Sequence, residues 1–228
     1  MKNHQTAITL YSITKIFKES YMLVRRYSKL FFASLFLAFV SMIANAEPVV
    51  NQPAPLFSNA ATANGNAVNL ADFLGKTVIL EWTNHECPFV KKHYETGNIP
   101  NLQKQAATQG IVWLQVISSA EGKQGFVDAA TAKKINAERG ATPSNTVFDA
   151  SGDIGKLYGA TNTPQFFIIN PKGVLTYKGG IDSIPSADKA DITKAENYIS
   201  AALNELAAGK TISTSTTKPY GCTVKYAS

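Results

Sequence analysis

The chain has 228 residues, with 22 Lys and Arg against 16 Asp and Glu and a formal net charge of +6. Six of the basic residues and one acid lie in the first 46 residues, which leaves 16 basic and 15 acidic residues in the remaining 182. A net charge of +1 lacks the concentrated positive charge of nucleic-acid binding, so we expect no nucleic-acid partner. An apolar fraction of 45% excludes a disordered or fibrous chain, and 182 residues suit one domain with a full hydrophobic core. Two cysteines are too few for a disulfide-dense miniprotein and raise the question of a single redox pair.

Residues 1–46 have the pattern of a secretory signal peptide. Arg25, Arg26 and Lys29 precede an uncharged apolar segment at 30–43, and Ala44-Asn45-Ala46 follows as a small-x-small cleavage site. Cleavage before Glu47 predicts a periplasmic or otherwise exported protein, in a compartment that permits disulfides and without a stable membrane anchor.

Alternatives remain open at this end of the chain. A permanent membrane span is the weaker interpretation, because about 20 apolar residues are needed to cross a bilayer. The Arg25-Arg26 pair is a feature of twin-arginine signals, but Tyr27-Ser28 after it fits that pattern poorly. Met22 would begin a leader of ordinary length, so we interpret it as a candidate true start.

After an extended, proline-punctuated opening segment, strand and helix patterns alternate. Nearly continuous apolar and β-branched runs predict buried strands, and apolar residues at helical spacing predict helices. The expected strands are 67–70, 77–83, 111–117, 146–148 and a hairpin of 165–169 with 173–178; the expected helices are 88–108 with an interruption near 97–100, 125–139, 154–158 and 187–208. This order predicts an α/β fold with a central mixed sheet and helices on both faces. The domain is expected to span 47–209, with a polar tail at 210–228 that carries Cys222.

Cys87 is the first candidate for chemistry. It lies between a buried strand and a helix that Pro88 opens. The partial positive charge of a helix N-terminus favours the thiolate and lowers a cysteine pKa from about 8.5. A protonated His85 adds to this effect, while Glu86 opposes it. The alternative is a buried, inert cysteine, and the charged residues His85 and Glu86 just before Cys87 disfavour it.

Several segments resemble one family. Residues 78–90 (VILEWTNHECPFV) resemble the active-site strand and turn of thioredoxin-fold proteins. Residues 149–173, with DASG, LYG and TPQFFIINPKG, resemble the redoxin branch, which includes alkyl hydroperoxide reductase and thiol-specific antioxidant (peroxiredoxin-like) proteins. Residues 54–57 and 68–76 match the opening hairpin of that branch, and 221–226 (GCTVKY) resemble the closing segment of a peroxiredoxin-like subgroup. The resemblance implies a thioredoxin-like fold and thiol–disulfide or hydroperoxide chemistry with no cofactor.

The same resemblance assigns roles to individual residues. Cys87 matches the nucleophilic, solvent-facing cysteine. Thr163 and Pro164 match the loop whose proline is cis and which leaves backbone groups free to pair with an extended substrate; we place Pro88 with them as substrate-binding. Glu81 matches a buried acid that assists proton transfer, and its alternative is a surface glutamate at a sheet edge. Glu81 and His85 would then move protons during exchange.

Three departures from the family pattern bear on activity. Val90 stands where thioredoxins carry their second cysteine, so no disulfide forms within the turn. Asn84 stands where typical peroxiredoxins carry a threonine or serine. Arg139 is the only arginine after residue 46, and it is expected at a helix end far from the family's arginine position. We therefore expect thiol–disulfide exchange to lead and peroxide reduction to follow, with disulfides or hydroperoxides as substrates and a thiol as electron donor.

Cys222 is the candidate partner of Cys87, 135 positions along the chain. A mobile tail would let its thiolate resolve an oxidised Cys87. A purely structural disulfide, or static staple, is the second interpretation, because closing so long a loop stabilises the folded state by about 4–5 kcal/mol in the chain-entropy model. Pairing between subunits is the third. We favour the redox-active pair.

A different function class also fits some of these residues. Cys87 with His85 or His93 resembles the donor set of a copper-binding thioredoxin-fold module, since thiolate and imidazole suit copper. We favour a solvated His93 beside Lys91 and Lys92 over this site and expect no metal.

Overall fold

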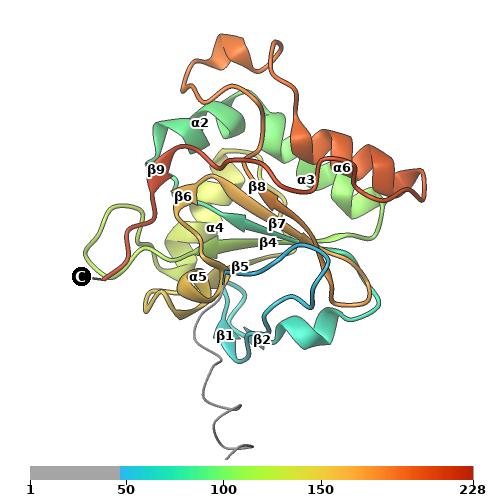
Figure 1. Ribbon diagram of the computed structural model, residues 1–228. Helices are drawn as coiled ribbons and strands as arrows, with labels where there is room; N and C mark the ends of the chain where they lie inside the picture. Colours follow the sequence, from blue (N-terminus) through green and yellow to red (C-terminus); the bar gives the residue numbers. More distant parts are fainter. Residues whose placement is uncertain (1–46, 228) are drawn as a thin grey trace, which may run out of the picture. The chain divides into compact units, whose positions relative to one another are not determined.

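The computed structural model describes residues 47–227, and the expected leader lies outside the described residues. Its elements, labelled as in Figure 1, are β1 (Ala60–Ala61), β2 (Ala67–Val68), the 3₁₀ helix η1 (Leu70–Phe73), β3 (Val78–Trp82), α2 (Pro88–Glu95), α3 (Asn98–Thr108), β4 (Val112–Ile117), α4 (Ala129–Glu138), β5 (Asn145–Phe148), α5 (Asp153–Tyr158), β6 (Asn162–Thr163), β7 (Gln165–Ile169), β8 (Leu175–Gly179), the 3₁₀ helix η2 (Lys189–Asp191), α6 (Tyr198–Ala207) and β9 (Cys222–Thr223). In this part of the chain, no helix combines the length and the apolar character that crossing a membrane requires.

Five strands form the central sheet, in the order β5-β4-β3-β7-β8. The pairs β3–β4 and β4–β5 are parallel, whereas β7 is antiparallel to both β3 and β8. All five residues of the central strand β3 are buried, as its continuous apolar run predicts. The predicted mixed sheet and the predicted hairpin are confirmed.

Successive side chains of β3 point to opposite faces of the sheet. Leu80 and Trp82 pack with α5 and with the N-terminal segment that contains β1, β2 and η1. Ile79 packs with α2, α3 and α6 on the other face. Asn136 of α4 donates to Gln115 of β4, whose side chain points to this second face. Helices therefore cover both faces, as predicted (Figure 1).

Two helices are shorter than predicted. The helix expected at 125–139 begins only at Ala129, because Asp128 caps it through Thr131 N at 2.7 Å. The helix expected at 187–208 is reduced to α6, whose N-cap Asn197 accepts from Ser200 N. The residues before Asn197 instead form a loop with η2, closed by a hydrogen bond from Ser183 N to Glu196 O at 3.0 Å.

The tail is part of the fold. It runs beside β8, where Lys178 N donates to Ser215 O and Thr217 N donates to Lys178 O, both at 3.1 Å. It then pairs with β6 through β9, and Ala120 N donates to Lys225 O at 2.8 Å beyond it. Figure 1 shows this red segment running from α6 past β8 to β9, which lies near α2. The tail therefore packs along the domain as an ordered segment.

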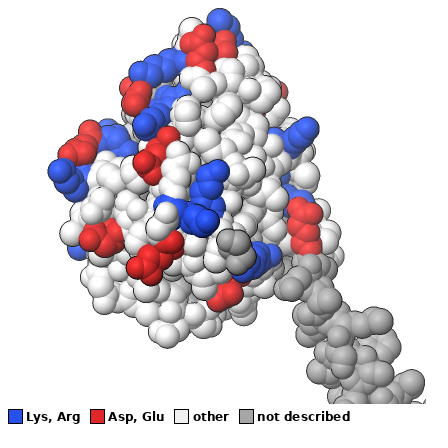
Figure 2. Space-filling view, turned by 90° about the vertical axis from the view of Figure 1, so that its left-hand side faces the viewer, with Lys and Arg blue, Asp and Glu red and all other residues white. Residues whose placement is uncertain are grey.

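The surface carries charges of both signs. On the face in Figure 2, acidic and basic side chains alternate, with white, uncharged surface between them. This mixture agrees with the near-neutral composition of the chain after residue 46.

The aromatic cluster of one face provides a test of the core. Phe167 is fully buried, and its ring centroid lies 5.2 Å from the ring centroids of both Trp82 and Tyr158. Phe167→Ala should lower the free energy of unfolding by about 3–5 kcal/mol, because it removes this packing and leaves a cavity. Leu74→Ala, at a side chain that is 63% exposed, should change it by less than about 0.5 kcal/mol. Urea unfolding of the oxidised chains measures both, and equal effects would contradict the assignment of Phe167 to the core.

Candidate active site

Cys87 is held by the turn between β3 and α2. It is the N-cap residue of α2, and Pro88 occupies the first helical position and is exposed. Asn84 O accepts from Cys87 N at 3.1 Å, and Asn84 Oδ1 accepts from Glu86 N at 2.9 Å. Gly125 N donates to Glu86 Oε2 at 2.6 Å, which ties the turn to the loop before α4. The geometry thus fixes the sulfur at the positive end of a helix.

Cys87 and Cys222 form a disulfide within the chain, with their Cα atoms 6.0 Å apart. The described residues hold no free cysteine. The structure thus pairs the two cysteines with each other, within one chain.

Cys87 is not solvent-facing, contrary to the prediction. Its exposed fraction is 0% in the disulfide-bonded chain, whereas Cys222 is half-buried. Phe89 and Tyr220 pack in the same cluster, with ring centroids 5.9 Å apart. The sequence pattern places Cys87 at a surface turn, but the tail then covers that turn.

The loop before β7 meets Cys87 as the resemblance implies. The Thr163-Pro164 peptide bond is cis. Thr163 O lies 3.2 Å from Cys87 Sγ, and both Thr163 and Pro164 are buried. The backbone edge of β6 is not free for a substrate, however, because β9 pairs with it and sets Thr163 opposite Cys222.

Glu81 is an interior carboxyl group with an exposed fraction of 0%, and not a surface residue at a sheet edge. Tyr94 Oη donates to its Oε1 at 2.6 Å, and Trp113 Nε1 donates to its Oε2 at 2.7 Å. Gln103 Nε2 adds a longer hydrogen bond at 3.4 Å. Burial raises the pKa of Glu81 above its ordinary value, although the Arg139 charge and the hydrogen bonds from Tyr94 and Trp113 act in the opposite direction. Tyr94 is therefore a polar partner of the buried acid.

Arg139 lies closer to the buried acid than its sequence position indicates. Its guanidinium carbon is 3.5 Å from the centroid of the Tyr94 ring, a cation–π contact. Its Nη2 donates to Asn136 Oδ1 at 2.8 Å, which fixes the plane of the guanidinium. A cleft of about 480 Å³ opens here, lined by His85, Val90, Lys91, Tyr94, Glu95, Ile135, Glu138 and Arg139.

His85 is half-buried beside this cleft. Partial burial lowers the pKa of His85, the Arg139 and Lys91 charges lower it further, and Glu86 opposes the shift. The protonated form is thus disfavoured at neutral pH. His85 therefore presents a neutral imidazole that can accept a proton, and it adds less positive charge near Cys87 than the sequence indicates.

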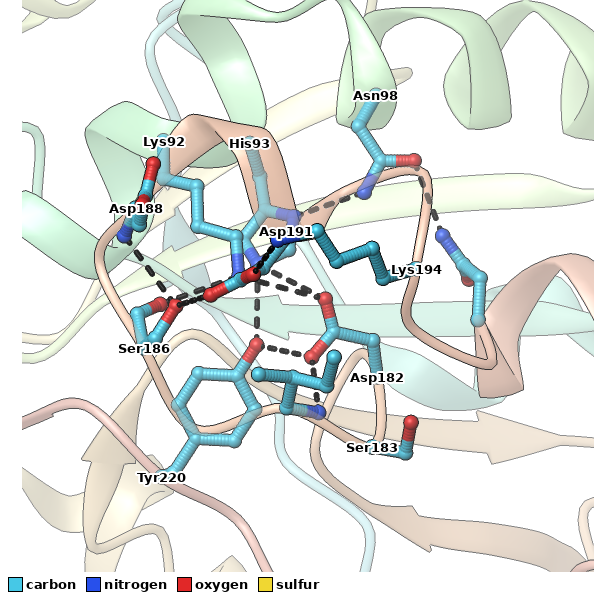
Figure 3. Close-up of polar contacts among 12 residues, drawn as sticks. Lys92, His93, Asn98, Asp182, Ser183, Ser186, Asp188, Asp191, Lys194 and Tyr220 are labelled. Atoms are coloured by element: carbon cyan, nitrogen blue, oxygen red, sulfur yellow. Dashed lines mark hydrogen bonds and ion pairs between the residues drawn. The ribbon is translucent and has the colours of Figure 1, made fainter.

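His93 is buried, contrary to the expectation of a solvated histidine, and its neighbour Lys92 is buried as well. Figure 3 shows them from α2 pointing toward Asp182 and Tyr220. Lys92 Nζ lies 3.6 Å from Asp182 Oδ2 and donates to Ser186 O at 3.1 Å. Burial, together with the Lys92 charge, lowers the pKa of His93 to about 3, so this histidine is neutral.

The ring nitrogens of His93 are both occupied. Nδ1 accepts from Asn98 Nδ2 at 2.7 Å, and Nε2 lies 3.2 Å from Tyr220 Oη, to which the neutral ring donates. Both ring nitrogens through which His93 could bind copper are therefore engaged within the protein.

The comparisons with known proteins agree with this architecture. A family model described as Redoxin matches residues 49–199. The chain belongs to the redoxin family. The match ends before the tail, so Cys222 and its strand lie outside the region that the family model covers. A comparison with curated proteins found no match.

Three solved structures are similar to this redoxin at low sequence identity, two of them with TM-scores above 0.6. An uncharacterized conserved protein from Geobacillus kaustophilus is 23% identical with a TM-score of 0.64, over 78% of this chain and 93% of that one. A hypothetical protein from Sinorhizobium meliloti 1021 is 24% identical with a TM-score of 0.62, over 80% and 97%. The thioredoxin domain of a thiol-disulfide oxidoreductase from Bacteroides vulgatus is 22% identical with a TM-score of 0.45, over 57% and 87%.

Sequence reasoning missed the buried polar cluster that holds the tail. Asp182 follows β8 in a loop without a motif, and its partner Lys92 is 90 positions away, so nothing local pairs them. Tyr220 carried a usable signal, because an aromatic residue two positions before a candidate cysteine is unusual in a Thr- and Ser-rich tail.

The buried acid predicts a pH dependence of stability. The unfolded chain loses the Glu81 proton near pH 4.5, whereas the folded chain holds it to higher pH. The folded state then binds more protons, so this group makes the free energy of unfolding fall as pH rises from 4.5 through the folded-state pKa, by at most about 1.4 kcal/mol per pH unit. Glu81→Gln should remove this slope in urea unfolding between pH 4.5 and 8. Glu121→Gln, at an exposed site, should keep the wild-type slope, and parallel profiles for all three chains would contradict the assignment.

Proposed function

We propose that this redoxin catalyses thiol–disulfide exchange in an exported compartment, with Cys87 and Cys222 as its redox pair. One observation carries the proposal: the disulfide joins the N-cap cysteine of α2 to a second cysteine directly opposite Thr163. Cys87 is the nucleophile, Cys222 resolves, and Thr163, Pro164 and Pro88 border the substrate position.

Reduction of the protein begins at the more exposed sulfur. A donor thiolate attacks Cys222 Sγ, the bond to Cys87 breaks, and Cys87 leaves as a thiolate. The N-terminus of α2 stabilises this leaving group, and a lower leaving-group pKa speeds exchange. A second donor thiolate attacks the donor sulfur of the mixed disulfide and releases Cys222. The products are two protein thiols and one donor disulfide.

Exchange with a substrate runs through Cys87. Its thiolate attacks one sulfur of a substrate disulfide, and the other substrate sulfur leaves as a thiolate. Cys222 then attacks Cys87 Sγ, releases the substrate and restores the internal disulfide. The neutral imidazole of His85 accepts the thiol proton, and Glu81, with its raised pKa, serves as the buried proton reservoir.

Hydroperoxides are a second substrate class for the same nucleophile. The Cys87 thiolate would attack a peroxide oxygen, release an alkoxide or hydroxide and become a sulfenic acid; Cys222 would attack that sulfur and release water. This class ranks second because both polar atoms of the Asn84 amide are engaged, with Glu86 N and Gln124 O, and Arg139 is engaged with Asn136.

The redox pair should be active toward a small disulfide. The reduced chain that begins at Glu47 should convert one oxidised glutathione to two thiols as the Cys87–Cys222 disulfide forms, followed by mass spectrometry of the protein. Cys222→Ser should stop with one glutathione on Cys87. Cys87→Ser should react roughly five- to tenfold more slowly at pH 7, because Cys222 lacks the helix N-terminus that favours the thiolate.

Two results would contradict this mechanism. Equal rates for the two cysteine variants would remove Cys87 as the preferred nucleophile. A disulfide that dithiothreitol leaves intact in the native protein would indicate the static staple. Mixing the reduced chain with hydrogen peroxide separates the substrate classes, since loss of the Cys87 thiol at the rate of free cysteine confines the function to exchange.

The proposal of export has its own test. The full chain, produced in a bacterial host, should appear in the exported fraction with Glu47 as its N-terminal residue, as read by mass spectrometry. Replacing the small residues at the cleavage site, Ala44→Leu with Ala46→Leu, should leave the leader attached. An intact leader on the wild-type chain, or its retention in the cytoplasm, would overturn the proposal.

A further inference from the structure

The segment 215–226, called the strap below, pairs with β6 as an extended peptide does, and forms with it a two-stranded sheet separate from the central sheet. β9 pairs antiparallel with β6, with Asn162 opposite Thr223 and Thr163 opposite Cys222. Val224 N donates to Thr161 O at 3.0 Å, and Asn162 Nδ2 donates to Gly221 O at 3.0 Å. The strand pairing and the bond from Val224 N are main-chain hydrogen bonds, which bind any extended segment, whereas side-chain pockets supply the selectivity.

The first such pocket receives Tyr220, two residues before Cys222. Its hydroxyl donates to Asp182 Oδ1 and accepts from His93 Nε2 at 3.2 Å (Figure 3). The pocket itself is built without the strap. Asp182 is 3% exposed, and it keeps Ile184 N on Oδ1 at 3.1 Å and the Lys92 ammonium near Oδ2. Phe89 of α2 contacts the Tyr220 ring edge to face. The pocket therefore matches an aromatic ring that carries a hydroxyl group.

The residue between Tyr220 and Cys222 restricts the sequence of the strap a second time. Gly221 has φ +111°, and a Cβ atom there would overlap the carbonyl group of Thr163. This carbonyl is the one that faces Cys87 Sγ. Glycine alone fits this position without moving the active-site loop.

We infer that the strap occupies the site of a partner protein's extended segment with the sequence Tyr-Gly-Cys, and that reduction of the disulfide opens this site. The inference rests on the proposed function and names its substrate class. Once the Cys87–Cys222 bond is broken, only non-covalent contacts of a half-exposed, polar segment hold the strap. A partner segment then competes for the β6 edge, and its cysteine takes the place of Cys222. Two lines of evidence agree: the pocket is preformed by α2 and the loop after β8, and the strap lies outside the family match at 49–199.

The covalent step balances without a further reactant. The Cys87 thiolate attacks the cysteine sulfur of a partner disulfide, a Cys87–partner disulfide forms, and the other sulfur of the partner leaves as a thiolate. Cys222 returns to the β6 edge, attacks Cys87 Sγ and expels the partner cysteine as a thiolate. The partner is reduced by two electrons, and the protein is oxidised by two.

Peptides with the sequence of residues 218–224 (KPYGCTV) test the inference. Each peptide is supplied as its mixed disulfide with glutathione to the reduced Cys222→Ser chain, and mass spectrometry follows the peptide bound to Cys87. The change Tyr220→Phe in the peptide should slow labelling about tenfold, because it removes hydrogen bonds to a buried charged group. Gly221→Ala in the peptide should slow it at least as much. Thr223→Ala, at an exposed side chain, is the matched control and should stay within about twofold.

A variant of the pocket tests whether Asp182 selects for the tyrosine hydroxyl group of the peptide. In a chain with Asp182→Asn and Cys222→Ser, the ratio of the rates for the tyrosine and phenylalanine peptides should fall toward one. Circular dichroism checks that this chain folds. If it does not fold, the peptide series with the Cys222→Ser chain tests the inference. An unchanged ratio would overturn the role of Asp182.

The experimental results that would overturn this inference differ from those that would overturn the proposed function. Equal, rapid labelling by all four peptides would overturn the selectivity of the groove and leave Cys87 exchange intact. No labelling by any peptide, together with no reaction with oxidised glutathione, would overturn the proposed function itself.

Discussion

The architecture of this site depends on one constraint, the disulfide between Cys87, the N-cap residue of α2, and Cys222 in the C-terminal strand β9. The bond places Cys222 opposite Thr163, and that register brings Tyr220 to the buried Asp182 on one side and Val224 to the backbone of Thr161 on the other. The Thr- and Ser-rich tail is held against the domain by these contacts. The same contacts cover Cys87, so the disulfide-bonded protein hides the sulfur of the proposed nucleophile.

Two buried polar groups beside this bond have different physical roles. Glu81 is surrounded by neutral donors, and burial raises its pKa, which suits a group that holds a proton inside the sheet. Asp182 instead lies 3.6 Å from Lys92 Nζ and accepts hydrogen bonds from Ile184 N and from Tyr220 Oη. The first group contacts Tyr94 of α2, and the second contacts Tyr220 of the strap. The groups proposed to handle protons and to recognise a segment therefore have different neighbours.

Much of the fold could be predicted from local pattern. The apolar runs gave β3, β4 and β7 within a residue or two, and the turn at Asn170-Pro171 gave the β7–β8 hairpin. The predictions failed where a loop makes long-range contacts. The segment before α4 is loop because Gly125 binds Glu86, and the segment before α6 leaves the helical path because Ser183 binds Glu196 and Ser186 binds Lys92. Helical spacing alone carries no information about such partners.

The sequence by itself determined the family, the sheet, and Cys87 at the start of a helix, because these follow from residue types and spacings within short segments. It also named Cys222 as a partner, since no other cysteine exists. Only the tertiary structure decided that Cys87 is covered, that His93 and Lys92 are interior, and that Arg139 lies over Tyr94. These facts depend on contacts between residues that are far apart in the chain, and burial changes both the accessibility and the charge state of a side chain without any change in its sequence neighbourhood.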